Sequence, residues 1–197
     1  MSIVFSTFFY RKLLYTHSML NLTSSTVLLY PTDTIYGIGG LITPEVIRKI
    51  KEIKQRPDDK WYSIIAPSIE WIPRYFAVPD PFTNERTKRV MKFPWRWITL
   101  FLPLREDRPQ DIDLSIIKND NTVGVRLLRH SFQEEVYKIG KPIITTSANL
   151  SWHPVITHPD QLTAEQKNLI DIILDEGEIH ADPSVIIDWQ TGAMIRK

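Results

Sequence analysis

Short apolar runs rich in β-branched residues alternate with amphipathic stretches along most of this chain, and this alternation limits its fold more than any other feature. Runs of this length, bounded by turn residues, are typical of buried strands. We expect strands within residues 26–30, 61–66, 97–104, 121–128, 141–146, 170–174, 184–189 and 193–196.

Helical patterns separate several of these runs. In the segment TPEVIRKIKEIK, Thr43 suits the N-cap and Pro44 the first helical position, and apolar residues recur at helical spacing as far as Lys54. Further helices are expected at 84–91, at 131–140 with Ser131 as N-cap and Gly140 as stop, and after a capping box at 163–166. Strands that alternate with helices predict the α/β (α+β) class, built on one sheet. The polar stretch 105–120 is expected to be a surface loop.

Length and charge exclude several classes of protein. The 197 residues fit one domain of ordinary size, which we place at residues 20–197. No apolar run approaches the roughly 20 residues that cross a bilayer, so we expect no membrane partner. The formal net charge is +1, so binding of nucleic acid would need a local basic surface. The absence of cysteine excludes disulfides, thiolate nucleophiles and cysteine-ligated zinc, and it suits a cytoplasmic protein.

Residues 1–19 are set apart as an N-terminal extension. Their apolar part is interrupted by Arg11 and Lys12, and no small-residue cleavage pattern follows, so a signal peptide is not indicated. Two interpretations stay open, an ordered extra element and a dispensable extension.

The stretch YPTDTIYGIGG at residues 30–40 follows the first expected strand. It is either a glycine-rich turn that ends the strand or the floor of a ligand site, with glycines that give the chain room to turn.

A basic cluster follows the helix that ends at Lys54. Arg56 and Lys60 lie just beyond it, with Pro57 between them. The cluster either complements the dipole at the helix C-terminus or binds an anion such as phosphate or carbonate.

Two further polar features stand at the ends of expected strands. The loop TTSANLS at 145–151 is either a solvated turn or a neutral cradle of hydroxyl and amide groups for phosphate oxygens. Arg126 ends an otherwise apolar strand, where it forms either a structural ion pair or a ligand contact. Loops at the ends of neighbouring strands converge, and open α/β sheets place their ligands there. The five histidines show no paired spacing, so we expect no metal site built from them.

Taken in order, the segments YPTDTIYGIG, KQRPDDK, VGVRLLRH, TTSANLS and DPSVIID resemble the YrdC/Sua5 family of threonylcarbamoyl-AMP synthases, over roughly residues 26–196. The resemblance implies a twisted, mostly β sheet with flanking helices around a deep basic cavity that binds L-threonine, bicarbonate and ATP. It implies that the threonine amine is carboxylated, that the carbamate attacks the α-phosphorus of ATP, and that pyrophosphate leaves. The product would pass to a threonylcarbamoyl transferase complex for N6-threonylcarbamoyladenosine modification of tRNA at adenosine 37. Mg²⁺ would ride on the ATP phosphates without protein ligands.

The family motifs also assign roles to individual residues. The resemblance implies catalytic roles for Lys54 and Arg56; ATP contacts from Lys54, Arg56, Lys60, Thr122, Ser147, Ala148, Asn149 and Arg196; and threonine contacts from Thr32, Thr34, Arg126, Thr146 and Ser184. The chain departs from the family where Trp95, Arg96 and Trp97 replace a Pro-Gly-Pro segment, and where Trp152 replaces a glycine.

Two other functions remain open on the sequence. One is a module of the same fold that binds tRNA or other structured or double-stranded RNA through a basic concave face and lacks synthase activity. The other is a related enzyme that transfers a carbamoyl group to a different acceptor.

Overall fold

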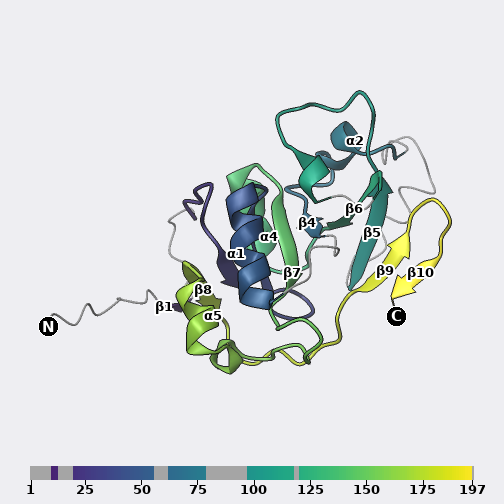
Figure 1. Ribbon diagram of the computed structural model, residues 1–197. Helices are drawn as coiled ribbons and strands as arrows, with labels where there is room; N and C mark the ends of the chain where they lie inside the picture. Colours follow the sequence, from purple (N-terminus) through teal and green to yellow (C-terminus); the bar gives the residue numbers. More distant parts are fainter. Residues whose placement is uncertain (1–9, 13–19, 56–61, 79–96, 118–119, 197) are drawn as a thin grey trace, which may run out of the picture.

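A computed structural model describes residues 10–12, 20–55, 62–78, 97–117 and 120–196 (Figure 1). Its strands are β1 (Tyr10–Lys12), β2 (Leu28–Tyr30), β3 (Gly37–Leu41), β4 (Ser63–Ile65), β5 (Ile98–Pro103), β6 (Thr122–Arg126), β7 (Ile143–Ser147), β8 (Ile172–Asp175), β9 (Val185–Asp188) and β10 (Met194–Arg196). Its helices are α1 (Pro44–Lys54), α2 (Ile72–Tyr75), α4 (Phe132–Ile139) and α5 (Ala164–Asn168), with 3-10 turns at Leu114–Ile116 and Pro159–Gln161.

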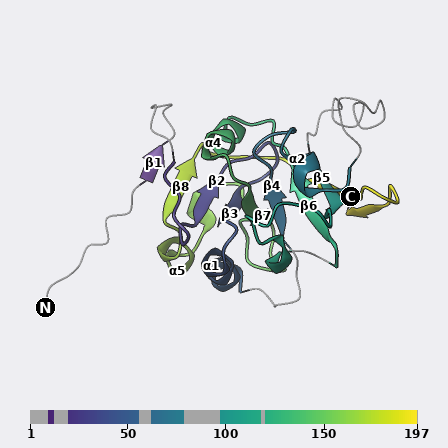
Figure 2. The same ribbon diagram turned by 90° about the horizontal axis from the view of Figure 1, so that it is seen from above.

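The strands form one mixed sheet in the order β1-β8-β2-β3-β7-β4-β6-β5-β9-β10. Figure 2 shows α1 and α5 on one face of this sheet and α4 on the other. The expected α/β class is therefore confirmed, with a single sheet and flanking helices. None of the described helices is long and apolar enough to span a membrane.

Alternating side chains of β2 supply both faces of the sheet, as successive residues of a strand must. Leu28 and Tyr30 enter the hydrophobic cluster under α4, where the Tyr30 ring stacks on Phe132 with centroids 4.2 Å apart. Leu29 enters the cluster under α1. All three β2 side chains are fully buried, which fixes the register of the strand between the two helical layers.

Helix α1 begins and ends where the sequence predicts. The Thr43 side chain accepts a hydrogen bond from the backbone N–H of Val46 at 3.2 Å, and Pro44 occupies the first turn. Gln55 ends the helix in the left-handed conformation. The C-terminal end of this helix lies beside the loop that follows β7, because the backbone N–H of Ser151 donates to the Lys54 carbonyl oxygen at 2.9 Å.

The glycines of the YPTDTIYGIGG stretch have a different role from the one the sequence suggested. They belong to strand β3, which pairs antiparallel with both β2 and β7. A Cβ atom on Gly39 would overlap the carbonyl oxygen of Ile144, and one on Gly37 would press on the Tyr30 ring. These glycines therefore allow close strand packing, and the expectation that they give the chain room to turn is wrong. Only residues 31–36 form the loop.

Two other local predictions need correction. Ser131 stands at the start of α4, but its side chain makes no capping hydrogen bond. The ring nitrogen Nδ1 of His130 accepts from the backbone N–H of Phe132 at 3.2 Å instead. The stretch 105–120 is not wholly a surface loop, because Leu114 and Ile117 are buried in the core.

One of the remaining local predictions is confirmed, and another concerns residues that the structure does not describe. The capping box at Thr163 is present, with the Thr163 and Gln166 side chains each bonded to the other residue's backbone N–H. The helix expected at 84–91 lies outside the described residues. Within the N-terminal extension, residues 10–12 are described, and β1 pairs parallel with β8 at the edge of the sheet.

Candidate active site

A cavity of about 430 Å³ lies beside the sheet. It is bordered by the loop before β3, by strands β3 to β7, and by the C-terminal segment that contains β9 and β10. Its volume lies in the range of roughly 300–1,000 Å³ that is usual for small-molecule sites. The lining residues are Thr32, Ile35, Tyr36, Gly37, Ser63, Thr99, Arg126, Thr145, Thr146, Ser147, Ser184, Ile186 and Ile195. Hydroxyl groups dominate this lining, and Arg126 is the charged residue among its described members.

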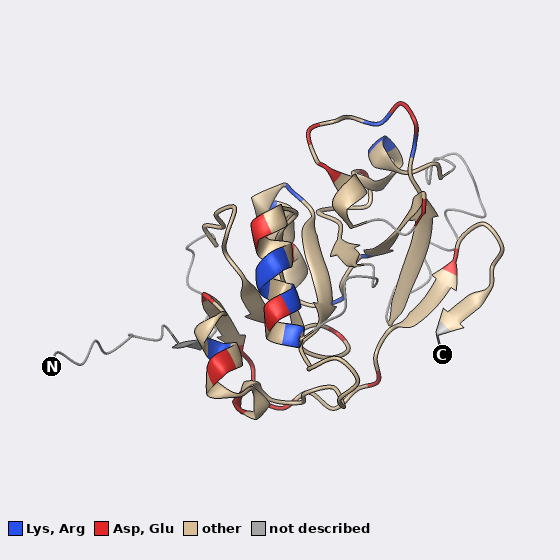
Figure 3. Cartoon of the chain, viewed as in Figure 1, with Lys and Arg blue, Asp and Glu red and all other residues tan. Residues whose placement is uncertain are grey.

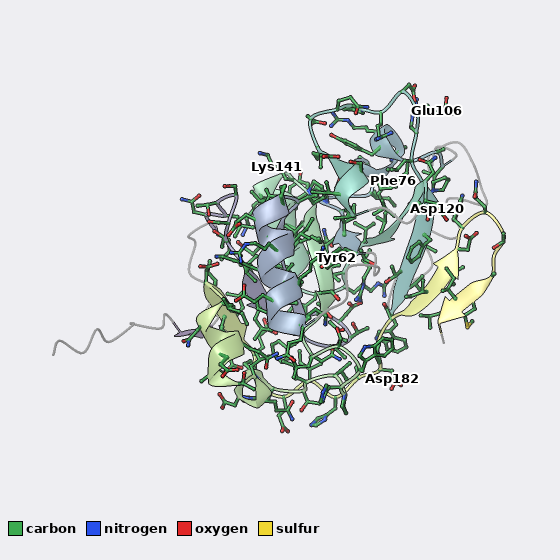
Figure 4. The ribbon with its side chains drawn as sticks, viewed as in Figure 1. Tyr62, Phe76, Glu106, Asp120, Lys141 and Asp182 are labelled. Carbon is green, nitrogen blue, oxygen red and sulfur yellow. The ribbon has the colours of Figure 1, made fainter. Side chains whose placement is uncertain are left out.

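Sheet register explains why distant motifs meet here. Gly37 of β3 pairs with Ser147 of β7, and Thr145 of β7 pairs with Ser63 of β4. β4 in turn pairs parallel with β6, whose last residue is Arg126. The connection from β8 to β9 runs along the lower edge of the molecule past Asp182 and supplies Ser184 (Figure 4).

Five of the residues that the sequence assigned to ligand binding therefore line one cavity: Thr32, Arg126, Thr146, Ser147 and Ser184. They come from the loop before β3, the ends of β6 and β7 and the segment before β9, whereas Arg56 and Lys60 of the basic cluster lie outside the described residues.

A chain of hydrogen bonds organises the loop before β3. The Thr32 hydroxyl donates to the Ile35 carbonyl oxygen at 2.7 Å and accepts from the Thr34 and Ile35 backbone N–H groups at 3.1 and 3.2 Å. The Thr34 hydroxyl lies 3.0 Å from that of Thr32 and accepts from Nη2 of Arg126 at 3.2 Å. Because the Thr32 proton is committed to Ile35, the Thr34 hydroxyl donates to Thr32. Thr34 lies behind Thr32 and Arg126, outside the described lining.

Arg126 combines the two roles that the sequence left open. It is 7% exposed, it lines the cavity, and its Nη2 lies 2.9 Å from Oδ1 of Asp33. The arginine is therefore a buried ion-pair partner and also presents a charged group to any ligand in the cavity.

Several polar residues of the lining had not been assigned from the sequence. Thr99 and Ser184 share a hydrogen bond at 2.8 Å, and the Tyr30 hydroxyl donates to Thr145 at 2.7 Å. Burial raises the pKa of Tyr30, which keeps this phenol a neutral donor. Ser63 and Thr99 interrupt apolar strands, and this is the signal in the sequence that marks them.

Tyr36 ties the cavity wall to the β8–β9 connection. Its hydroxyl donates to the Gly177 carbonyl oxygen at 2.7 Å and accepts from the Glu176 N–H at 3.1 Å. Burial raises the pKa of Tyr36 to about 12. The phenol therefore stays protonated at neutral pH and holds the connection that carries Ser184.

Lys54 is buried beside the cavity and is outside its described lining. Its ammonium group donates to the carbonyl oxygens of Ser147 and of Asn149, the latter at 2.7 Å, and lies 3.5 Å from Oδ1 of Asn149. The Asn149 amide donates to the carbonyl oxygens of Leu150 and His153 at 2.9 and 2.6 Å. The basic end of α1 therefore holds the TTSANLS loop in shape from behind.

The other assigned residues lie elsewhere. Arg56 and Lys60 fall outside the described residues, and β10 contains the backbone of Arg196. Ala148 is buried, and its N–H donates to the Tyr36 carbonyl oxygen at 3.0 Å. Thr122 starts β6, at the opposite end of that strand from Arg126.

Two tryptophans stand in left-handed backbone conformations, with φ of 67° at Trp97 and 70° at Trp152. Glycine is the residue that adopts this conformation without strain. Trp97 donates its indole N–H to the Asp33 carbonyl oxygen at 3.1 Å, and Trp152 is 82% exposed. Trp95 and Arg96 lie outside the described residues.

Acidic and basic residues are mixed along α1 and α5 (Figure 3), and the strands β2, β3, β4, β5 and β7 carry neither. Among the described residues, no three His, Asp or Glu side chains gather as metal ligands do.

Comparisons with known proteins give a consistent result. The family model named for Sua5, YciO and YrdC, and described as "Telomere recombination", matches residues 21–197. The threonylcarbamoyl-AMP synthase of Shigella boydii is 27% identical over 179 residues, which are 89% of this chain and 91% of that protein. The synthase of Vibrio campbellii is 28% identical over 182 residues, which are 89% and 94% of the two chains.

Solved structures share the fold. P. abyssi Sua5 complexed with L-threonine has a TM-score of 0.69 and 28% identity, and the match covers 84% of this chain. This chain spans about half of that longer protein, since 48% of it is covered. E. coli YciO has a TM-score of 0.71 and 22% identity, with 88% of this chain and 83% of YciO covered, and its likeness concerns the fold alone.

Proposed function

The chain belongs to the Sua5/YciO/YrdC family, and we propose that it is an enzyme that makes threonylcarbamoyl-AMP and pyrophosphate from L-threonine, bicarbonate and ATP. The relatives that match it over about nine-tenths of their length carry the name of this synthase. A Sua5 of the same fold has been crystallised with L-threonine.

One observation carries the proposal. Arg126 lines a cavity whose other polar side chains in the described lining are hydroxyls, contributed by Thr32, Tyr36, Ser63, Thr99, Thr145, Thr146, Ser147 and Ser184. A guanidinium group binds a carboxylate through charge-assisted hydrogen bonds, and hydroxyls suit the rest of an amino-acid or phosphate ligand. In this arrangement Arg126 binds the threonine carboxylate, Thr32, Thr146 and Ser184 form the threonine side of the site, and Thr34 supports Arg126 from behind.

The chemistry needs no protein nucleophile. The threonine amine adds to the carbon of bicarbonate or carbon dioxide, and with bicarbonate one water is released. A carbamate oxygen then attacks the α-phosphorus of ATP, and the bond to the bridging oxygen of pyrophosphate breaks. Such a displacement is accelerated by positioning and by stabilisation of charge. A cavity of fixed hydroxyls and one guanidinium supports that kind of catalysis.

The ATP side of the site is assigned to the loop after β7 and to the basic residues near it. Ser147, Ala148 and Asn149 present backbone and side-chain groups at the end of β7, and Lys54 donates to the carbonyl oxygens of Ser147 and Asn149. Lys54 and Arg56 are the proposed charge-stabilising residues, and Lys60, Thr122 and Arg196 complete the proposed ATP contacts.

Mg²⁺ would bind the ATP phosphates and neutralise part of their charge. The side chains of the described lining fit that arrangement, because its polar members are hydroxyls and Arg126, and the carboxylate of Asp33 is paired with Arg126.

The product would be used by a threonylcarbamoyl transferase complex that modifies tRNA. The interpretation as an RNA-binding module has less support, because acidic and basic residues are mixed along α1 and α5 (Figure 3), whereas an RNA backbone is bound by clustered positive charge. The alternative enzyme, which transfers a carbamoyl group to another acceptor, would form a different product, so identification of the product distinguishes it from the synthase.

Mass spectrometry of the purified protein with the three substrates tests the proposal. Threonylcarbamoyl-AMP and pyrophosphate should form only when L-threonine, bicarbonate and ATP are all present, and Arg126→Ala should remove most of the product. Omission of any one substrate without loss of product would contradict the proposal. Salt-sensitive binding of tRNA without any adenylate product would favour the RNA-binding module.

A further inference from the structure

Asp33 lies directly behind the charged group of the cavity. Its side chain is 5% exposed, and its Oδ1 accepts from Nη2 of Arg126 at 2.9 Å. Its other carboxylate oxygen lies 3.5 Å from the backbone N–H of Arg129. Arg126 borders the cavity and Asp33 is outside the described lining, so the carboxylate contacts the guanidinium from the protein side.

The backbone of Asp33 also accepts a hydrogen bond. The Trp97 indole N–H donates to the Asp33 carbonyl oxygen at 3.1 Å, and the Trp97 carbonyl oxygen accepts from the N–H of Val185, the residue after Ser184. Trp97, which makes both of these hydrogen bonds, has its backbone in the left-handed conformation. Strained conformations persist where the surrounding structure imposes them, and they concentrate at functional sites.

The same guanidinium nitrogen contacts a second fixed group. Nη2 of Arg126 donates to the Thr34 hydroxyl at 3.2 Å, and Thr34 is fully buried. Asp33 and Thr34 are adjacent in the chain, so the loop before β3 grips one nitrogen of the guanidinium at two points. A planar group held at one end in this way has a defined orientation at the other.

We propose that Asp33 is a positioning residue that orients the Arg126 guanidinium for the carboxylate of an α-amino acid. The inference rests on the proposed function, because it takes L-threonine as that amino acid. Loss of the Asp33 carboxylate leaves a buried guanidinium without this counter-ion, which both frees its rotation and destabilises it. Affinity for L-threonine then falls, while the ATP side of the site is unaffected.

Three variants separate orientation from a general effect on the fold. Asp33→Ala removes the carboxylate, and Asp33→Asn keeps an acceptor oxygen in the same place but removes the charge. Asp107→Asn is the matched control, because Asp107 forms an exposed pair with Arg105 at 2.6 Å, outside the described cavity lining. Calorimetric titration gives the Kd for L-threonine, and steady-state kinetics gives KM for ATP.

Asp33→Ala should raise the Kd for L-threonine about tenfold, and Asp33→Asn about threefold, because a neutral hydrogen bond is roughly half as strong as a charge-assisted one. KM for ATP should stay within about twofold of wild type in both variants, and Asp107→Asn should match wild type. If Asp33→Ala does not fold, Asp33→Asn decides the question alone. An unchanged Kd for L-threonine in Asp33→Asn, or a parallel rise in KM for ATP, overturns the inference.

The test also distinguishes this inference from the proposed function. If the wild-type protein turns over and the Asp33 variants bind L-threonine as it does, the inference fails and the synthase function stands. If the wild-type protein binds L-threonine and loses affinity in the Asp33 variants but forms no adenylate, the inference stands and the synthase function fails. If the wild-type protein binds no L-threonine, both are wrong.

Discussion

The ammonium group of Lys54 donates to the carbonyl oxygen of Asn149 at 2.7 Å, and it also donates to the carbonyl oxygen of Ser147. These contacts join the last residue of α1 to the loop that follows β7. Lys54 is 4% exposed, so its charge is largely removed from water and is compensated by the loop. Lys54, to which the family motif assigns ATP binding, therefore also stabilises the loop after β7.

Replacement of Lys54 should cost stability as well as activity. Lys54→Met keeps the aliphatic stem but leaves two part-buried carbonyl oxygens without this donor, so we expect a loss of about 2 kcal/mol in the free energy of unfolding. Product formation should fall at the same time, because the loop that carries Ser147 loosens. Urea denaturation and the mass-spectrometric assay measure the two effects.

Lys141→Met is the control for this variant, since Lys141 is exposed and precedes β7 at the end opposite Ser147 (Figure 4). It should change neither quantity. Full stability in Lys54→Met would show that the loop does not depend on the ammonium group.

Gly39 should tolerate no side chain. A Cβ atom there would overlap the Ile144 carbonyl oxygen in the β3–β7 pairing, so Gly39→Ala should destabilise the protein by about 3 kcal/mol or more, as overpacked core positions do. Thermal denaturation measures the loss. Gly177→Ala is the comparison, because nothing lies near its Cβ position and only its φ of 85° opposes the change. That variant should lose about 1 kcal/mol, and equal losses in the two variants would argue against the close packing of β3.

Trp152 occupies a backbone conformation that suits glycine. Its φ is 70° and its side chain is 82% exposed, so Trp152→Gly should relieve strain and stabilise the protein by about 1 kcal/mol. Chemical denaturation with a single transition measures the gain. Tyr137→Gly, at an exposed aromatic residue within α4, should instead destabilise by about 1 kcal/mol. A loss of stability in Trp152→Gly would mean that the indole contributes more packing than its exposure indicates.

Stability should fall at high pH through the buried tyrosines. Burial raises the pKa of Tyr36 from 10.0 to about 12, so the unfolded chain releases this proton first as the pH rises. The contribution of Tyr36 is therefore complete below pH 10.0 and is lost between pH 10.0 and about 12. Tyr75, whose pKa is raised to about 12 by burial and by its hydrogen bond to Asp111, acts in the same direction.

Urea midpoints at intervals from pH 8 to pH 11 measure this decline. Tyr36→Phe should make it shallower, whereas Tyr137→Phe, at an exposed tyrosine, should leave it as in wild type. An identical decline in Tyr36→Phe and wild type would contradict the assignment to Tyr36.

Local patterns predicted most of the elements. The apolar runs became β2 and β4 to β10, and the caps at Thr43 and Thr163 mark the first turns of α1 and α5. These features depend on residues within a few positions of one another, so periodicity and capping are sufficient to find them. Strand β3 was missed because glycine-rich strands lack the apolar alternation that marks a strand.

Strand-end position predicted only part of the site. Thr32, Arg126, Ser147 and Ser184 stand at strand ends or in loops, and the sheet brings them into one cavity. Thr99 and Thr145 lie within strands and were not assigned. Their position on the cavity face depends on the pairing of β5 with β6 and of β3 with β7.

By itself, the sequence determined the class of fold, most of its strands and helices, and the motifs that identify the family. The tertiary structure decided that Asp33 pairs with Arg126, that Lys54 holds the loop after β7, and that the glycines of β3 serve packing. Local order is encoded in neighbouring residues. Contacts between residues about 90 positions apart are set by strand register and burial, which no local pattern contains.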